Sequence, residues 1–143
     1  MRSHVSEAEW DRLRKPVQRR AKSQCEICGG RGPTHAVECH EIWRYDDDTS
    51  VQELMGLTAL CPACHAVKHF GRTYTRGRAD EALQHLADVN GWTEEVAADY
   101  IALVLELWRL RSEVPWRLDL TWLTEHGITI PERDPAKARP PDA

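Results

Sequence analysis

The chain has 143 residues and a net charge of −4, a size that allows one ordinary domain or a small domain with a helical extension. It contains no apolar run of about 18 residues, and its first residues lack a signal-peptide core, so we expect a cytosolic protein without a membrane span. Four of the five cysteines fall in two Cys-x-x-Cys pairs, which in a reducing compartment favours metal binding over disulfides.

The N-terminal part combines a basic segment with a predicted strand. A helix is expected to start at Ser6, with Pro16 interrupting or restarting it. The alternation over residues 35–43 predicts a strand with His40 and Glu41 on opposite sides. A basic segment without an acidic residue contains Arg12, Arg14, Lys15, Arg19, Arg20 and Lys22. These residues form either a solvated face or a contact with nucleic acid.

Two further elements are predicted before the chain becomes strongly helical. Thr49 or Ser50 could cap a short helix or lead into a second strand through residues 51–61. A short helix begins at Pro62, a residue favoured in a first helical turn, and Gly71 is expected to end it. A second basic group accompanies this helix and consists of Lys68, Arg72, Arg76 and Arg78. In a nuclease, this group and the N-terminal basic segment would contact the nucleic-acid backbone.

Beyond Gly77 the pattern is that of amphipathic helices. The first ends at Asn90-Gly91 and has an apolar face made of Ala82, Leu83, Leu86 and Val89. The second is capped by Thr93. Its expected buried stripe is Val96, Tyr100, Leu103, Leu107 and Leu110.

The end of the chain is predicted to hold one more helix and a disordered tail. The helix covers residues 117–127, and the proline-rich, charged residues 131–143 form the tail. The helical half contains the tryptophans Trp92, Trp108, Trp116 and Trp122. We expect them in an aromatic core, although an exposed one could stack on a base.

The two cysteine pairs predict a structural zinc site. Four thiolates in two close pairs satisfy the tetrahedral coordination of zinc, and the expected ligands are Cys25, Cys28, Cys61 and Cys64. Such a site contributes on the order of 10–16 kcal/mol in zinc-finger peptides, comparable with the whole stability of a domain. The fifth cysteine, Cys39, is expected to be a small buried apolar residue.

Two histidines directly after the second cysteine pair suggest a second metal. His65 and His69 are four residues apart, so a helix presents both imidazoles on one face. The alternative is that one of them only donates a hydrogen bond near the zinc.

These segments resemble a known family. "CEIC", a strand with "ECHEI", and "GLTALCPACHAVKH" resemble the HNH endonucleases of the ββα-metal class, whose pattern is C-x-x-C, then HHI, then NLxxLCxxCHxxKH. The resemblance covers residues 25–71. It implies hydrolysis of nucleic-acid phosphodiesters with one catalytic divalent ion, a histidine base and a structural zinc.

Two positions depart from the family pattern, because "HEI" replaces HHI and Gly56 replaces an asparagine. Glu41 could act as the base, although a carboxylate is about two pKa units weaker than an imidazole. Alternatively His40 activates water while Glu41, His65 and His69 hold the ion. In the third interpretation catalysis is lost and the fold survives as a binding module.

The overall expectation is an α+β protein with a small zinc-bound ββα-metal core, a basic N-terminal helix and a C-terminal helical extension. The core occupies residues 1–78, the extension packed on it 79–130 and the tail 131–143. The expected function is an HNH-like endonuclease acting on DNA, and the alternative is an inactive zinc module that binds nucleic acid or a protein. The expected ions are Zn²⁺ at the cysteines and Mg²⁺, Mn²⁺ or Zn²⁺ at the histidines. The C-terminal helices could also form a homodimer.

Overall fold

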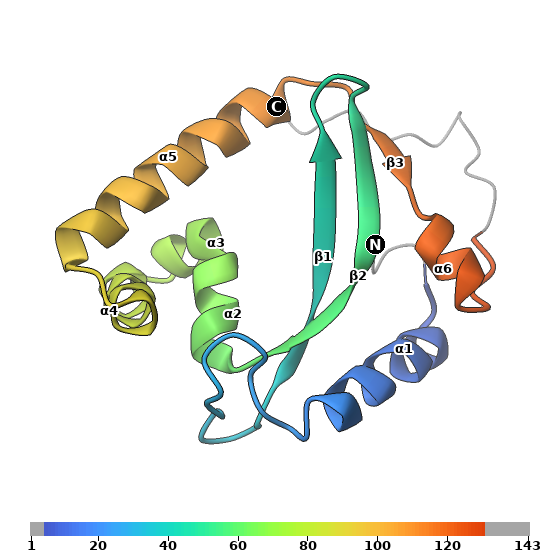
Figure 1. Ribbon diagram of the computed structural model, residues 1–143, viewed down its shortest axis with the longest axis horizontal. Coiled ribbons are helices and arrows are strands. Elements are labelled where there is room, and N and C mark those ends of the chain that lie inside the picture. Colours follow the sequence, from blue (N-terminus) through green and yellow to red (C-terminus); the bar gives the residue numbers. More distant parts are fainter. Residues whose placement is uncertain (1–4, 131–143) are drawn as a thin grey trace.

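A computed structural model describes residues 5–130. Within this range the protein is mixed α/β, with one three-stranded sheet in the order β1-β2-β3 and six helices around it (Figure 1). β1 (Glu38–Asp46) and β2 (Val51–Leu60) form a long antiparallel hairpin. The short β3 (Arg117–Asp119) runs parallel to β2. The predicted disordered tail, residues 131–143, lies outside the described residues.

The hairpin turn decides between the two alternatives left open at Thr49 and Ser50. The carboxylate of Asp46 accepts hydrogen bonds from the backbone N–H groups of Asp48 and Thr49. This arrangement closes the turn, and the chain continues as β2 rather than as a helix. The hairpin therefore brings the "ECHEI" segment directly beside the segment that leads to the second cysteine pair.

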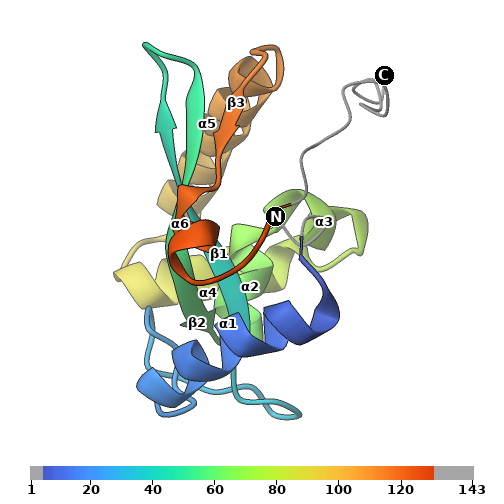
Figure 2. The same cartoon turned by 90° about the vertical axis from the view of Figure 1, so that its right-hand side faces the viewer.

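α1 (Glu7–Arg20) supplies one wall of the main core. Ser6 and Glu9 form a capping box at its start, and the helix continues through Pro16 without the expected interruption. Its apolar face packs across β1 and β2 (Figure 2). The buried residues of this core are Trp10, Leu13, Val17, Val37, Leu54, Leu57, Ala59, Leu123 and Ile128.

α2 (Pro62–Lys68) and α3 (Phe70–Thr75) follow β2 almost without a linker. The break between them is at His69, whose ψ of 44° is not helical, so Gly71 lies inside α3 instead of ending the first helix as expected. Gly71 has no neighbouring atoms where a Cβ would project, and nothing there forces a stop. α4 (Ala79–Asn90) packs against α2 and α3 and ends at Gly91 in the left-handed conformation, as the sequence predicted.

α5 (Glu94–Ser112) contradicts the expectation of a buried apolar stripe. Only Ala97 and Ile101 of this helix are buried. The expected stripe is exposed along its whole length: Val96, Tyr100, Leu103, Leu107 and Leu110. The reason lies in the neighbours of α5, because among the described residues it packs on α4 near its start and meets the hairpin turn near its end (Figure 1).

The far end of α5 is fastened to the hairpin by side chains. Arg111 donates two hydrogen bonds to Asp47, at 3.0 and 2.6 Å, and its guanidinium lies 4.4 Å from the centre of the Tyr45 ring. Trp116 packs edge-on against the same ring. Trp116 and Trp122 are partly buried, whereas Trp92 and Trp108 are 38% and 67% exposed, so the expected aromatic core includes only part of the set.

The predicted last helix is shorter than residues 117–127. Residues 117–119 instead form β3, because the backbone N–H of Arg117 bonds to the Ser50 carbonyl and extends the sheet. α6 (Thr121–Glu125) follows, and Leu123 and Ile128 close the main core. None of the helices in residues 5–130 combines the length and apolar character needed to cross a membrane.

Candidate metal centres

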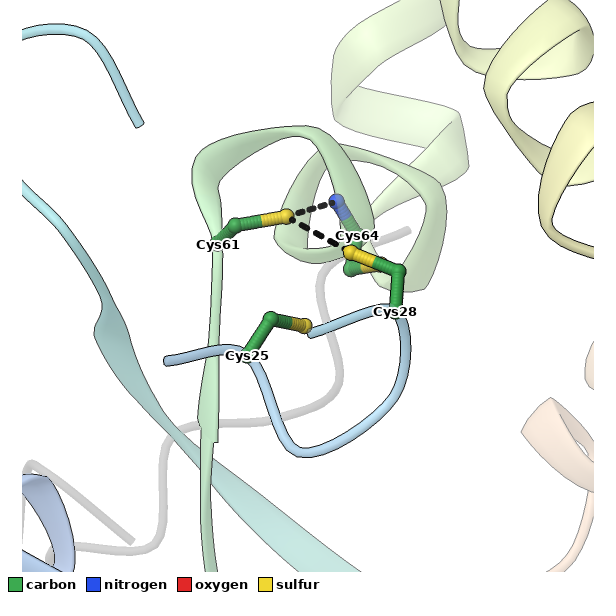
Figure 3. Close-up of side chains that lie close together, drawn as sticks. All are labelled: Cys25, Cys28, Cys61 and Cys64. Atoms are coloured by element: carbon green, nitrogen blue, oxygen red, sulfur yellow. Dashed lines mark hydrogen bonds between the residues drawn. The ribbon is translucent and has the colours of Figure 1, made fainter. Parts of the chain in front are cut away.

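The four cysteines of the two Cys-x-x-Cys pairs converge on one point (Figure 3). Cys25 and Cys28 come from the loop after α1, Cys61 from the end of β2 and Cys64 from α2. Their sulfur atoms all lie within 4.8 Å of one another, and those of Cys28 and Cys61 are 3.6 Å apart. Cys28 is partly exposed and the other three are buried. This geometry is close enough to bind a metal ion such as zinc, as the spacing predicted.

Electrostatics favour a cation among these thiols. Burial by itself raises the pKa of Cys25, but hydrogen bonds from the backbone of Cys28, Cys61 and Ile27 bring it down to about 7. Burial and the neighbouring sulfur atoms raise the pKa of Cys64. Four adjacent thiols cannot all ionise without a compensating charge, and a divalent ion supplies that charge.

One contact to the cysteine group was missed by the sequence reasoning. His85 of α4 places Nε2 3.1 Å from the Cys64 sulfur. An imidazole N–H that donates to a ligand sulfur stabilises the thiolate form. His85 follows Ala82 by three residues, so it lies on the same helix face that was predicted to be apolar. This position on the predicted apolar face was the available signal in the sequence. The contact of His85 with Cys64 couples α4 to the cysteine group.

A second group brings together three histidines. His40 of β1 joins His65 of α2 and His69, and their candidate ligand nitrogens lie within 4.8 Å of one another. The ring centroids are 4.6 to 5.2 Å apart, and the ring planes are nearly perpendicular. Three imidazoles at this separation could bind a metal ion.

The environment of the His40 side chain suits a metal ligand. Its Nδ1 is buried and has no hydrogen-bond partner among the described residues, which is costly for a polar atom unless something binds there. Burial, and then the charges of His69 and His65, lower the pKa of His40 to about 4. Burial also lowers the pKa of His69. At neutral pH His40 is therefore uncharged, the form that coordinates a metal.

Glu38 organises the histidines and was not anticipated as a site residue. One of its carboxylate oxygens pairs with Nδ1 of His65, and the other lies 3.0 Å from Nε2 of His35. A carboxylate on one imidazole nitrogen fixes the ring and leaves the other nitrogen for a metal. Glu38 precedes His40 by two residues on the same strand. Strand alternation therefore puts both on one face, which is the signal the sequence contained.

The other residue of "HEI" does not join the histidine group. Glu41 is not among the described residues that could hold an ion with His65 and His69, contrary to the interpretation in which it was a ligand. The physical reason is strand alternation, which directs Glu41 to the face opposite His40. That face carries Cys39 and Trp43, which pack against the main core. Burial raises the pKa of Cys39 to about 11, although the residue is partly buried rather than fully buried as expected.

Gly56 has a backbone role at the second departure from the family pattern. It pairs with Ile42, and the register shifts immediately after this pair as a β-bulge. Its φ is 154°, a value that L side chains rarely adopt. An asparagine at this position would have to adopt the same backbone geometry.

A cavity of about 260 Å³ opens beside the histidine group. His35, Glu38, His65 and His69 form part of its wall, together with Arg72, Arg76 and Arg78. Arg78 pairs with Glu81. Among residues 5–130, Arg72 and Arg76 take part in no ion pair, so their charges are available to an anion.

The remaining basic residues expected to contact nucleic acid lie elsewhere. Lys68 lines a separate groove between α2, α4 and α5. Arg14 and Lys15 both pair with Asp11, and Arg20 pairs with Glu26. Arg12, Arg19 and Lys22 are exposed. α1 lies across the hairpin from α2 (Figure 1), so its basic residues are on the other side of the hairpin from the helix that lines the cavity.

No protein-family model, curated protein or solved structure matches this chain. The chemistry of the two metal-competent groups and of the cavity beside them is therefore the basis for a functional assignment.

Proposed function

We propose that this chain is an HNH-type, metal-dependent endonuclease that hydrolyses phosphodiester bonds in DNA. The observation that carries the proposal is the group of three histidines beside a cavity with two arginines. Within residues 5–130, the buried Nδ1 of His40 has no hydrogen-bond partner and neither arginine takes part in an ion pair. The order of the elements supports it. A hairpin followed directly by a helix, with a cysteine pair before the hairpin and another at the helix start, is the arrangement that the ββα-metal resemblance implies.

In this proposal the histidines hold the catalytic ion and the cysteines hold a structural zinc. The ligands of the catalytic ion are His40, His65 and His69. A divalent ion there, Mg²⁺, Mn²⁺ or Zn²⁺, would stabilise negative charge on the phosphate and on the leaving oxygen. Imidazole ligands favour Mn²⁺ or Zn²⁺ over Mg²⁺, which prefers oxygen ligands.

The other residues of the cavity divide between orientation and substrate binding. Glu38 orients His65 through Nδ1. Arg72 and Arg76 suit contacts with the phosphate backbone, which give affinity rather than sequence preference. His35 lines the same cavity outside the metal-competent group and is held by Glu38. We assign the proton-accepting role to His35, because Glu41 is directed to the opposite face of β1.

The experiment is a nicking assay on supercoiled plasmid DNA, combined with metal analysis of the same samples. The wild-type chain should hold two metals and nick DNA. His65→Ala should lose the second metal and the activity, yet keep the cysteine metal and the melting temperature. His35→Ala should keep both metals and lose most of its activity, on the order of 100-fold for a general base. These two variants separate a ligand from a base.

The assay also decides the alternative function. Glu41 and Gly56 depart from the family pattern, which favours an inactive zinc module. If the wild type cuts neither DNA nor RNA with added Mg²⁺, Mn²⁺ or Zn²⁺, and holds a single metal, the endonuclease proposal is wrong. Glu41→His restores HHI, and higher activity in that variant would identify the natural chain as a weakened nuclease.

A further inference from the structure

The exposed face of α5 has the spacing of a helix-pairing seam. Val96, Tyr100, Leu103, Leu107 and Leu110 follow one another at alternating intervals of four and three residues, the repeat that brings apolar side chains onto one line between two helices. All five are exposed, from 44% at Leu107 to 72% at Leu103. A helix with such a seam normally buries it against a partner.

The position of α5 leaves this seam accessible. The helix is anchored near its two ends, by Ala97 and Ile101 near its start and by Arg111 on Asp47 at its end. Between these anchors it lies at the outer edge of the molecule (Figure 1). A second helix can therefore approach along its length without displacing an element of the described chain.

The chemistry of α5 excludes several occupants. Residues 131–143 contain no leucine, isoleucine, valine or aromatic residue, so they offer no matching apolar face. The polar side of α5 carries Glu95, Asp99 and Glu106, and its Arg109 is paired with Glu106 and Glu113, whereas helices that lie on membranes carry many lysines and arginines there. The same acidic residues repel a nucleic-acid backbone.

We propose that α5 pairs in antiparallel fashion with α5 of a second copy of this chain, with the two-fold axis at Leu103. Leu103 is the midpoint of Glu94–Ser112, and the seam extends seven residues to either side of it, to Val96 and to Leu110. An antiparallel pair about this point matches the whole seam with itself and opposes the two helix dipoles. This inference does not depend on the proposed function.

The size of the contact sets its expected strength. A helix of 19 residues is about 28 Å long, and two such helices packed along their length bury on the order of 1,000 Å² in total. That is near the lower limit for a specific interface, so we expect a dimer that dissociates on dilution. The pairing also brings Asp99 close to Glu106 of the second copy, but Glu106 already pairs with Arg109 of its own helix, so we expect the dimer to depend little on salt.

The test is sedimentation equilibrium of the full zinc-loaded chain over a range of concentrations. Wild type should shift from one to two chains as concentration rises. Leu103→Glu should weaken association by more than about tenfold, because it buries a carboxylate at the centre of the seam. Ala102→Glu is the matched control, since Ala102 is exposed on the polar side of α5 and should leave association unchanged. Both positions are exposed in the single chain, so circular dichroism and zinc content should stay at wild-type values.

Three outcomes would overturn the proposal. They are a wild type that stays monomeric at every concentration, a Leu103→Glu variant that associates like wild type, and equal loss of association in both variants. The first would leave a different protein as the occupant of the seam.

Discussion

The core around the two metal-competent groups and helix α5 carry equally regular sequence patterns. The apolar residues of the pattern are buried in the core but exposed on α5. In the core, the cysteine pairs and the apolar residues of α1, β1 and β2 bury one another. In α5, an apolar seam of ideal spacing remains exposed. A periodic apolar pattern therefore predicts that a face will be buried. It does not show whether the surface that buries this face belongs to the same chain.

The largest expected effect comes from breaking the cysteine group. Cys61→Ser should remove the metal and prevent stable folding, because structural zinc sites contribute on the order of 10 kcal/mol. Metal analysis and a thermal melt measure both quantities. A Cys61→Ser chain with unchanged metal content and melting temperature would show that the four-cysteine assignment is wrong.

A pair of leucine substitutions compares the two regions directly. Leu54 is 1% exposed and Leu103 is 72% exposed. Leu54→Ala should lower the free energy of unfolding by about 2–5 kcal/mol, whereas Leu103→Ala should change it by less than about 0.5 kcal/mol in the monomer. Urea unfolding at a concentration below dimer formation gives both values. Similar losses in the two variants would mean that α5 folds back onto the core in solution.

The contact from α4 to the cysteine group should have a smaller effect. His85→Ala removes the imidazole from the Cys64 sulfur and should weaken metal affinity by about 10–100-fold without changing the fold. Competition with a chelator measures the affinity. The neighbouring exposed residue Gln84 provides the control, since Gln84→Ala should leave the affinity unchanged. Equal metal affinities in wild type and His85→Ala would show that the contact between His85 and Cys64 does not contribute to metal binding.

The smallest effect at neutral pH, which grows only as the pH falls, concerns the protonation of His40. Its pKa in the folded chain is about 4, below its ordinary value of 6.5, so the unfolded chain binds the proton first. With the histidine group free of metal, the contribution of neutral His40 to the free energy of unfolding should be fully present above pH 6.5. It should be lost as the pH falls toward 4. His40→Gln removes the titration, and its urea-unfolding curves should show a shallower decline over this range. Parallel declines in the two chains would contradict the buried, neutral state of His40.

The sequence by itself determined the features that depend on local spacing. Two Cys-x-x-Cys pairs and the four-residue interval between His65 and His69 place ligands on single turns, so their chemistry could be read before any fold was known. The caps at Ser6 and Thr93 and the stop at Gly91 are equally local, since each depends on backbone groups within a few residues.

Only the tertiary structure decided which distant residues meet and which faces remain uncovered. The β1-β2 hairpin register turned His40 toward His65 and His69 and directed Glu41 to the opposite face. Packing of α4 on α2 brought His85 to Cys64. Residues 117–119 became a strand because they pair with the edge of β2. Burial and proximity depend on what packs against a residue, and a spacing pattern does not contain that information. For the same reason, the apolar spacing of α5 could be predicted from the sequence, but the exposure of these residues could not.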